Sequence, residues 1–288
     1  MPIDPRAVEI DGLRFEDGPG GLVRGVVATA ACEGAFTLHG AQVTRWRPAG
    51  HDDVLWLSPN ATYEDGRAIR GGIPICFPWF GAHPSDLAKP SHGLARTRAW
   101  SLAAVEHRGD AIEVALEARI EEWACRLTAS FGAELVATLA VRNEGAAPAS
   151  FEAALHAYFA ISDITEVLVA GLEDAPYLDM AAGNASRAAE GTPIRFSGEV
   201  DRLYLGRPDS TVTIEDAART IEVADTNARS TVVWNPGIEK ARGLADLGEV
   251  EWRRMVCVET ANVRGDAVTL APRETSTLSS AVRVRPRA

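Results

Sequence analysis

The sequence predicts an all-β fold, either a sandwich or a barrel of antiparallel strands. Short runs of alternating apolar and polar residues recur along the chain, and turn residues separate them at intervals of about ten residues. Helical periodicity is scarce. No repeat, low-complexity tract or polar hinge divides the chain, so we expect a single domain over residues 1–288.

The expected strands follow one another with few interruptions. His39-Gly40 and Arg108-Gly-Asp110 each lie between two strand-like runs, which is typical of hairpin turns. The best helical candidate is short and covers 238–247. In chain order, we expect strands at 22–31, 35–38, 41–46, 53–57, 100–106, 111–118, 126–131, 134–142, 150–159, 211–214, 220–223, 231–234, 256–259, 267–270 and 276–284.

Composition excludes several classes of function. The chain has 288 residues, is 46% hydrophobic and 24% charged, and carries a net charge of −11. This charge argues against nucleic acid and against an anionic membrane surface as partners. No apolar run is long enough for a membrane span, and the first residues lack the basic start and apolar core of a signal peptide. We therefore expect a cytoplasmic protein.

The cysteines give no sign of a disulfide or a metal centre. Cys32, Cys76, Cys125 and Cys257 are far apart and form no CxxC pair, so free thiols are expected. The six histidines also lack metal-ligand spacing. Searches for GxSxG, Walker, GxGxxG and HExxH motifs all fail. A zinc or nucleotide mechanism therefore has little support, and we expect no metal.

A stiff segment from Arg70 to Gly81 is the most informative part of the chain. It contains a Gly-Gly pair, and Pro74 and Pro78 each fix φ and remove an N–H donor, so an ordinary central strand is excluded. His92 and Arg96 follow closely. A rigid loop with two arginines and a histidine nearby suits an anionic or polyhydroxyl ligand.

Two further residues stand out by their position in expected strands. In an extended 150–159, His156 shares a face with small Ala154, which leaves room beside the imidazole for a ligand. Glu259 ends a strand that reads as buried, where a carboxylate is costly unless it is paired or functional. From residue type alone, each of these has a structural alternative. The same holds for Asp201, which could pair with Arg202 or cap a turn.

In combination, these motifs resemble the hexose-6-phosphate mutarotases, the glucose-6-phosphate 1-epimerase branch of the aldose 1-epimerase (galactose mutarotase-like) superfamily. The resemblance covers nearly the whole chain. It is carried by Leu38-His-Gly-Ala-Gln42, Arg70-Gly-Gly-Ile-Pro-Ile-Cys-Phe-Pro-Trp-Phe-Gly81, His92-Gly-Leu-Ala-Arg96, Leu155-His156, Asp201-Arg-Leu-Tyr204, Trp234-Asn-Pro236 and Val256-Cys-Val-Glu259.

The resemblance implies a large antiparallel β-sandwich and an enzyme that interconverts the α and β anomers of a hexose 6-phosphate. It assigns catalysis to His156 and Glu259, without a cofactor. It assigns substrate binding to Arg70, Arg96 and Asp201, which match the family motifs. His92, in the matching His-Gly-x-Ala-Arg motif, is expected to line the pocket, and Ser91 occupies the binding position just before it. The expected partner is a small sugar phosphate, and the expected state is a monomer.

Two departures from the family pattern matter. Ser91 stands where members often carry Gln, so its shorter side chain reaches less far. Thr260 follows Glu259 where many members have Pro, which we expect to loosen the strand end. Mutarotation of an unphosphorylated aldose and a non-catalytic sugar-binding or sensor role remain alternatives. Glycoside hydrolysis is weaker, because only Asp201 and Glu259 could supply its two carboxylates.

Overall fold

Antiparallel β-sheets make up nearly all of the regular secondary structure. The computed structural model describes residues 2–217 and 219–287. Its strands form two sheets of eight strands, one of four and one of two. Helix is limited to short pieces: α1 (Gly237–Ala241) and the 3-10 turns η1 (Pro5–Ala7), η2 (Pro19–Gly21), η3 (Ala95–Thr97), η4 (Glu251–Arg254) and η5 (Arg264–Asp266).

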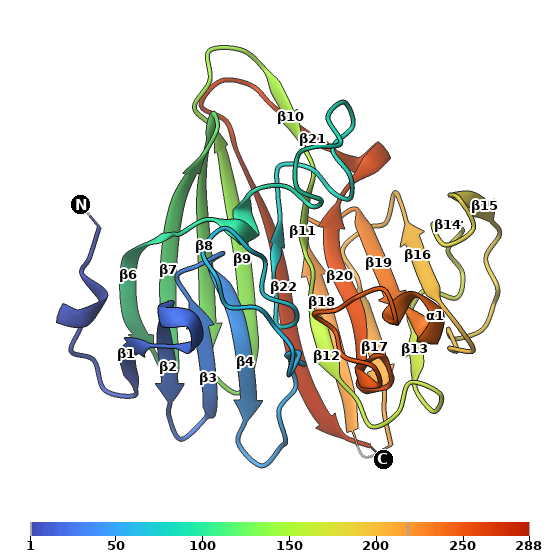
Figure 1. Ribbon diagram of the computed structural model, residues 1–288, viewed down its shortest axis with the longest axis horizontal. Coiled ribbons are helices and arrows are strands. Elements are labelled where there is room, and N and C mark those ends of the chain that lie inside the picture. Colours follow the sequence, from blue (N-terminus) through green and yellow to red (C-terminus); the bar gives the residue numbers. More distant parts are fainter. Residues whose placement is uncertain (1, 218, 288) are drawn as a thin grey trace.

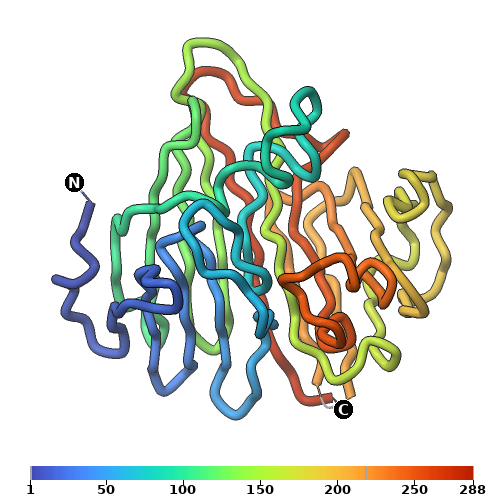
Figure 2. The backbone as a smooth tube through the Cα atoms, in the orientation of Figure 1, coloured from blue at the N-terminus to red at the C-terminus, as the bar shows by residue number. Residues whose placement is uncertain are grey.

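The first eight-stranded sheet, here called the long-strand sheet, forms the back layer of Figure 1. Its longest strand, β22, crosses the molecule and joins the green strands to the amber ones (Figure 2). In sheet order, its strands are β13 (Leu168–Ala170), β17 (Thr211–Glu215), β18 (Arg219–Thr226), β22 (Thr275–Pro286), β9 (Leu135–Asn143), β8 (Trp123–Phe131), β7 (Ala111–Ile120) and β6 (Ser101–Arg108).

The second eight-stranded sheet, here called the site sheet, carries the functional candidates. In sheet order, its strands are β15 (Ala185–Arg187), β14 (Tyr177–Asp179), β16 (Val200–Tyr204), β19 (Ser230–Asn235), β20 (Met255–Asn262), β11 (Ala153–Leu155) and β5 (Ile75–Cys76), and β12 (Tyr158–Ala160) also pairs with β20. The two-stranded sheet pairs β10 (Ala149–Phe151) with β21 (Val268–Leu270).

A four-stranded sheet continues the front layer. It consists of β1 (Leu13–Asp17), β2 (Val23–Ala28), β3 (Cys32–Thr37) and β4 (Gln42–Pro48), drawn in blue in front of the green strands (Figure 1). A bridge between Val43 and Ile73 links β4 to the chain that enters β5. Phe36 packs against Phe131 of the long-strand sheet, with ring centroids 5.8 Å apart. The expected antiparallel β-sandwich is therefore confirmed.

The site sheet is apolar on both faces, which decides where its polar residues point. All of β20 is buried, and its side chains alternate between two clusters. Val256 and Val258 face the core between the layers. Met255 and Cys257 face a second cluster on the outer side. Because the period is two, Glu259 projects to the outer side as well.

The expected strand 150–159 is broken into β10, β11 and β12. The breaks occur where this stretch lies against the proline-containing segment 72–78. Two N–H groups of 150–159 bond to proline carbonyls of that segment, His156 to Pro74 at 3.0 Å and Glu152 to Pro78 at 2.9 Å. A regular ladder is not needed there, because an irregular edge segment satisfies these backbone groups. Side chains still alternate between the two faces of the sheet despite these breaks, since Leu155 lies in the inner cluster and Ala154 in the outer one.

Three other sequence expectations need correction. Residues 53–57 form no strand and make only isolated bridges, at Leu55 and Leu57. The helix expected at 238–247 ends at Ala241, and the rest forms turns that contain Gly243. Glu259 lies inside β20 rather than at its end, and Thr260 continues the ladder.

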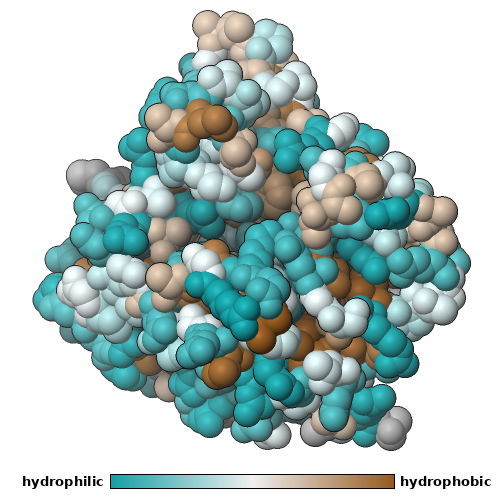
Figure 3. All heavy atoms as spheres, turned by 45° about the vertical axis from the view of Figure 1, so that its right-hand side comes forward, coloured by the Kyte–Doolittle hydropathy of each residue, from teal (hydrophilic) through white to brown (hydrophobic). Residues whose placement is uncertain are grey.

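No described helix is long and apolar enough to cross a membrane. In the space-filling view, the visible face is mostly hydrophilic, and apolar atoms show mainly in recesses (Figure 3).

Candidate active site

One cavity of about 550 Å³ on the outer side of the site sheet brings the candidate residues together. Larger surface hollows, of about 830 and 1140 Å³, lie elsewhere and contain none of them. The seven residues singled out from the sequence all line this cavity: Arg70, Ser91, His92, Arg96, His156, Asp201 and Glu259.

His156 and Glu259 face each other at the floor of the cavity. Strand register brings them together, because Leu155 pairs with Thr260 on one side and Tyr158 pairs with Cys257 on the other. The His156 Nε2 to Glu259 Oε1 distance is 3.3 Å, and the two side chains are 8% and 1% exposed. The imidazole also stacks on the ring of Tyr158, at 4.8 Å and an interplanar angle of 9°.

Burial moves the pKa values of this pair in opposite directions. It lowers the pKa of His156 well below 6.5, and nearby His92, Arg96 and Arg70 act in the same sense. Burial also raises the pKa of Glu259 well above 4.5, and Asp201 adds to this effect. The pair therefore loses its first proton from the imidazole and its last from the carboxyl. Between these steps it holds one proton in common.

His92 is held as a neutral hydrogen-bond donor. Its φ is +63°, which only a constrained non-glycine residue adopts. The backbone N–H of Gly81 donates to its Nδ1 at 3.3 Å, so the ring proton of the neutral form is on Nε2. Burial, with Arg96 and Arg70 nearby, lowers its pKa to about 3. The side chain is therefore uncharged at neutral pH.

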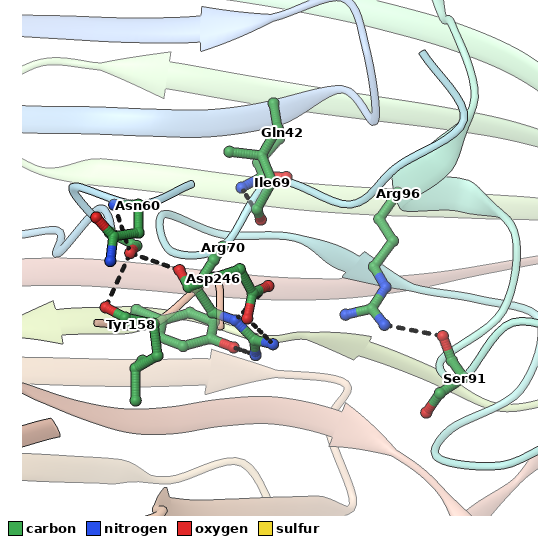
Figure 4. A network of polar contacts seen from close by, with 10 residues as sticks. Gln42, Asn60, Ile69, Arg70, Ser91, Arg96, Tyr158 and Asp246 are labelled. Carbon is green, nitrogen blue, oxygen red and sulfur yellow. Dashed lines mark hydrogen bonds and ion pairs between the residues drawn. The ribbon is translucent and has the colours of Figure 1, made fainter. Parts of the chain in front are cut away.

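The two arginines differ in how much of each guanidinium is occupied (Figure 4). Arg70 donates to both oxygens of Asp246, at 3.1 Å each, and to the hydroxyl of Tyr158 at 3.0 Å. Arg96 donates from Nη2 to the carbonyl of Ser91 at 2.8 Å. Its buried Nε has no hydrogen-bond partner among the described residues. Arg96 is therefore the freer of the two to receive an anion.

Asp201 comes from β16 and lies opposite a lysine rather than the arginine suggested by the sequence. Lys240 Nζ is 3.8 Å from its carboxylate, while Arg202 pairs with Glu190 at 2.9 Å. Burial raises the pKa of Asp201 to about 6, although Lys240 opposes the shift. An acceptor that titrates near neutrality is therefore placed at the cavity wall.

Several wall residues were missed from the sequence. The cavity also includes Lys240 on α1, Arg264 on η5, Phe80 and Asn184. Phe80 lies within the glycine- and proline-containing segment 70–81, so its place in the site could have been predicted from the sequence. Nothing in the sequence marked the other three. Ser91 contributes its backbone carbonyl to Arg96, so its shortened side chain is not what makes this contact.

The structure gives no positive sign of a metal centre. No group of His, Cys, Asp and Glu residues in the described ranges could hold an ion. All four cysteines are buried and free, as expected. Burial raises the pKa of Cys76 to about 12, so this thiol stays protonated beside the site.

The sequence of residues 27–283 matches the family model described as aldose 1-epimerase. The chain belongs to the aldose 1-epimerase family. A family relative from Cenchrus ciliaris, named "Putative glucose-6-phosphate 1-epimerase", is 36% identical over 276 residues, which cover 89% of this chain and 83% of that protein. A protein of the same name from Escherichia coli K12 is 32% identical and covers 82% of both chains.

Solved structures share the fold of this aldose 1-epimerase family member. The crystal structure of "a putative mutarotase (YeaD)" from Salmonella typhimurium matches with a TM-score of 0.89 and 29% identity, covering 96% of this chain and 95% of that one. A galactose mutarotase related enzyme from Lactobacillus acidophilus matches with a TM-score of 0.71 at 14% identity, covering 90% and 96%. That second likeness concerns the fold alone.

Proposed function

We propose that this protein interconverts the α and β anomers of a hexose 6-phosphate by opening and closing the sugar ring, with glucose 6-phosphate as the first candidate. The observation that carries the proposal is the His156–Glu259 pair, buried at the floor of a cavity whose wall also holds two arginines. The names of the relatives support the same substrate.

The reaction needs one acid and one base. Glu259 takes the proton from the anomeric O1, and His156 gives a proton to the ring oxygen O5. The C1–O5 bond breaks while the C1=O1 bond forms. Rotation about C1–C2 presents the other face of the carbonyl. Ring closure then returns the proton on O5 to His156 and the proton on Glu259 to O1, so no proton is gained or lost overall.

The single proton of the pair matches this cycle. Ring opening moves it from His156 to Glu259, and closure moves it back. The two tautomers of the buried pair are thus the two states that the enzyme needs. Burial favours the uncharged tautomer, with the proton on Glu259, which is the state that drives ring closure.

The remaining wall residues bind the substrate. Arg70 and Arg96 hold the phosphate, because a guanidinium matches phosphate oxygens in a bidentate way. Asp201 accepts a hydrogen bond from a sugar hydroxyl, and the Nε2–H of His92 donates one. Ser91 also lines the cavity. The proposal includes a monomer, no cofactor and a cytoplasmic location, where charged sugar phosphates are retained.

The test is NMR exchange between the anomers of glucose 6-phosphate. We expect the wild type to accelerate exchange and Glu259→Gln to lose about 10²–10⁴-fold of that rate, as for removal of a general base. Arg96→Ala should raise KM for glucose 6-phosphate far more than KM for glucose. Wild-type rates in Glu259→Gln would overturn the base assignment, and equal effects in Arg96→Ala would overturn the phosphate role.

Mutarotation of an unphosphorylated aldose is the second candidate. One observation favours it. Asp246 Oδ1 lies 3.1 Å from Arg70 Nη2 and compensates the charge of this arginine, which leaves less positive charge for a phosphate. Comparison of glucose, galactose and their 6-phosphates in the same exchange experiment separates the two candidates. A preference for the free sugars would favour the second.

A further inference from the structure

We propose that Asp246 is a positioning residue that fixes the guanidinium of Arg70 for the substrate phosphate and so contributes to the selection of phosphorylated sugars. This inference rests on the proposed function. Asp246 lies in the turns after α1 and is 176 residues from Arg70 in the sequence.

The contacts of Arg70 decide which of its donors remain for a ligand. A guanidinium has five N–H donors in a rigid plane. Nε and one N–H of Nη2 go to the two oxygens of Asp246, and one N–H of Nη1 goes to Tyr158 (Figure 4). The two donors left over are one N–H on each terminal nitrogen. A pair of this kind can hold two oxygens of a phosphate.

Arg70 and Arg96 share the walls of two adjoining cavities. Arg70 lines the catalytic cavity and also an adjoining one of about 320 Å³. Ser91 and Arg96 line both cavities as well. The two arginines therefore belong to the wall that the cavities share, and the proposal places the phosphate of the sugar against this wall.

Asp246 is itself held in place through Ser58. The backbone N–H of Ser58 donates to the carbonyl of Arg70 at 3.1 Å, and its hydroxyl donates to the carbonyl of Asp246 at 2.6 Å. One residue thus fixes both backbones. The Arg70 and Asp246 side chains are 20% and 32% exposed, so solvent competes only partly for their contact.

Tyr158 links this arrangement to the reacting groups. Its hydroxyl accepts from Arg70, while its ring stacks on His156 at 4.8 Å. Trp56 also stacks on the ring of Tyr158, with ring centroids 5.7 Å apart. The phosphate arginine and the catalytic histidine are therefore oriented by a common side chain.

The sign of the Asp246 effect distinguishes positioning from simple charge repulsion. If repulsion between the carboxylate and the phosphate dominated, removing the charge would lower KM for the sugar phosphate. We expect the opposite, because a guanidinium that is free to rotate loses both phosphate bonds at once. The lost orientation should raise KM for glucose 6-phosphate by at least about tenfold.

The experiment measures anomer exchange and ligand binding in Asp246→Asn and Asp246→Ala. The binding probe is 1,5-anhydroglucitol 6-phosphate, which cannot open its ring, titrated by calorimetry. We expect KM for glucose 6-phosphate and Kd for the probe to rise in the order wild type, Asn, Ala. The kcat for glucose 6-phosphate and the kinetics with unphosphorylated glucose should change less than about twofold. Glu239→Gln is the matched control, since this exposed acid on α1 pairs with Arg242 outside the cavity.

Tyr158→Phe gives a second, independent variant if the Asp246 variants fold poorly. It removes one acceptor of Arg70 and keeps the ring, so KM for the phosphate should rise while KM for glucose stays constant. Unchanged or lowered KM and Kd in folded Asp246 variants would overturn the positioning role. Equal losses for glucose and glucose 6-phosphate would also overturn it. Absence of exchange in the wild type would instead overturn the proposed function.

Discussion

At the scale of single residues, the chemistry depends on a histidine and a glutamate with opposite responses to burial. His156 resists gaining a proton, and Glu259 resists losing one. The apparent titrations belong to the pair rather than to either residue. Activity is lost at low pH, when the imidazole becomes protonated while the carboxyl keeps its proton. Activity is lost at high pH, when the carboxyl loses its proton.

We expect kcat with saturating glucose 6-phosphate to follow a bell-shaped pH profile with a broad top. The acid limb should lie well below pH 6.5, because burial lowers the pKa of His156. The basic limb should lie well above pH 4.5, because burial raises the pKa of Glu259. The profile is measured by NMR exchange. A single rise with its midpoint at pH 6.5, the behaviour of an ordinary histidine, would contradict the paired titration.

Asp201 should make sugar binding depend on pH. Its pKa of about 6 means that the ionised acceptor is dominant only above that pH, so KM for glucose should fall as pH rises through 6. Unphosphorylated glucose is the substrate of choice, because a phosphate group itself titrates near pH 6. In Asp201→Asn the dependence should disappear. A KM for glucose that did not change across pH 6 in the wild type would count against this role.

The same carboxyl should lower stability at high pH. Its folded pKa is raised above the unfolded value of 3.8, so the folded state binds more protons between these values. The stability that results is complete below pH 3.8 and is lost as pH rises through 6. Asp201→Asn should therefore be more stable than the wild type at pH 8, by at most about 3 kcal/mol in urea unfolding.

At the scale of elements, the site depends on close contact between the segment 70–81 and the chain around His92. Gly93 has a φ of +78°, and a Cβ there would lie 2.0 Å from the carbonyl oxygen of Phe77. A parallel bridge joins the same two residues. His92 and Arg96 flank this contact, so separating the segments would move both away from the cavity.

Gly93→Ala should lower the free energy of unfolding by about 2–4 kcal/mol and raise KM for the substrate. Gly109→Ala is the matched control, because Gly109 has a φ of +62° but no atom within 4 Å of its would-be Cβ. The control should lose only about 1 kcal/mol, from the backbone conformation alone. Urea unfolding and exchange kinetics measure both effects. Equal losses in the two variants would contradict the close-contact argument.

At the level of elements, the sequence predicted most of the long strands, but it missed β1, β5 and β13 to β16 and the interruptions within the longer runs. The hairpin of β6 and β7 follows from alternation and a Gly-Asp turn. The breaks in 150–159 do not, because they depend on hydrogen bonds to Pro74 and Pro78, which a reading of local pattern cannot pair with that segment. Alternation still placed His156 and Glu259 on the correct faces, since the side-chain period is independent of strand length.

The partner of Arg70 could not be predicted either. Asp246 lies in the turns that follow the truncated helix, where no local pattern points to Arg70. The same is true of Lys240 beside Asp201. Contacts between distant irregular segments depend on the packed fold rather than on periodicity. The roles assigned to the seven candidate residues stay predictions until variants are measured.

At the scale of the whole molecule, one apolar cluster runs between the two layers. It includes Phe36 of the four-stranded sheet, Leu139 of the long-strand sheet and Val258 of the site sheet. Trp46 also donates from its indole N–H to the carbonyl of Gly132 across the layers, at 3.0 Å. The site sheet carries a second apolar cluster on its outer side, but the inner cluster joins all three sheets into one unit.

A single domain should therefore unfold in one step. We expect the calorimetric enthalpy of thermal unfolding to equal the van't Hoff enthalpy. Sedimentation at the same concentration should report the mass of one chain, 30.8 kDa. Two separated transitions would contradict the single-domain prediction, and a larger mass would contradict the monomer.

The most direct test of the central claim is the anomer-exchange rate of the wild-type protein with glucose 6-phosphate and with glucose at equal concentrations. If the cavity selects phosphate through Arg70 and Arg96, kcat/KM for glucose 6-phosphate should exceed that for glucose by at least about a hundredfold, as expected for two lost charge-assisted contacts. An equal or higher kcat/KM for glucose, or no acceleration of either exchange, would contradict the account.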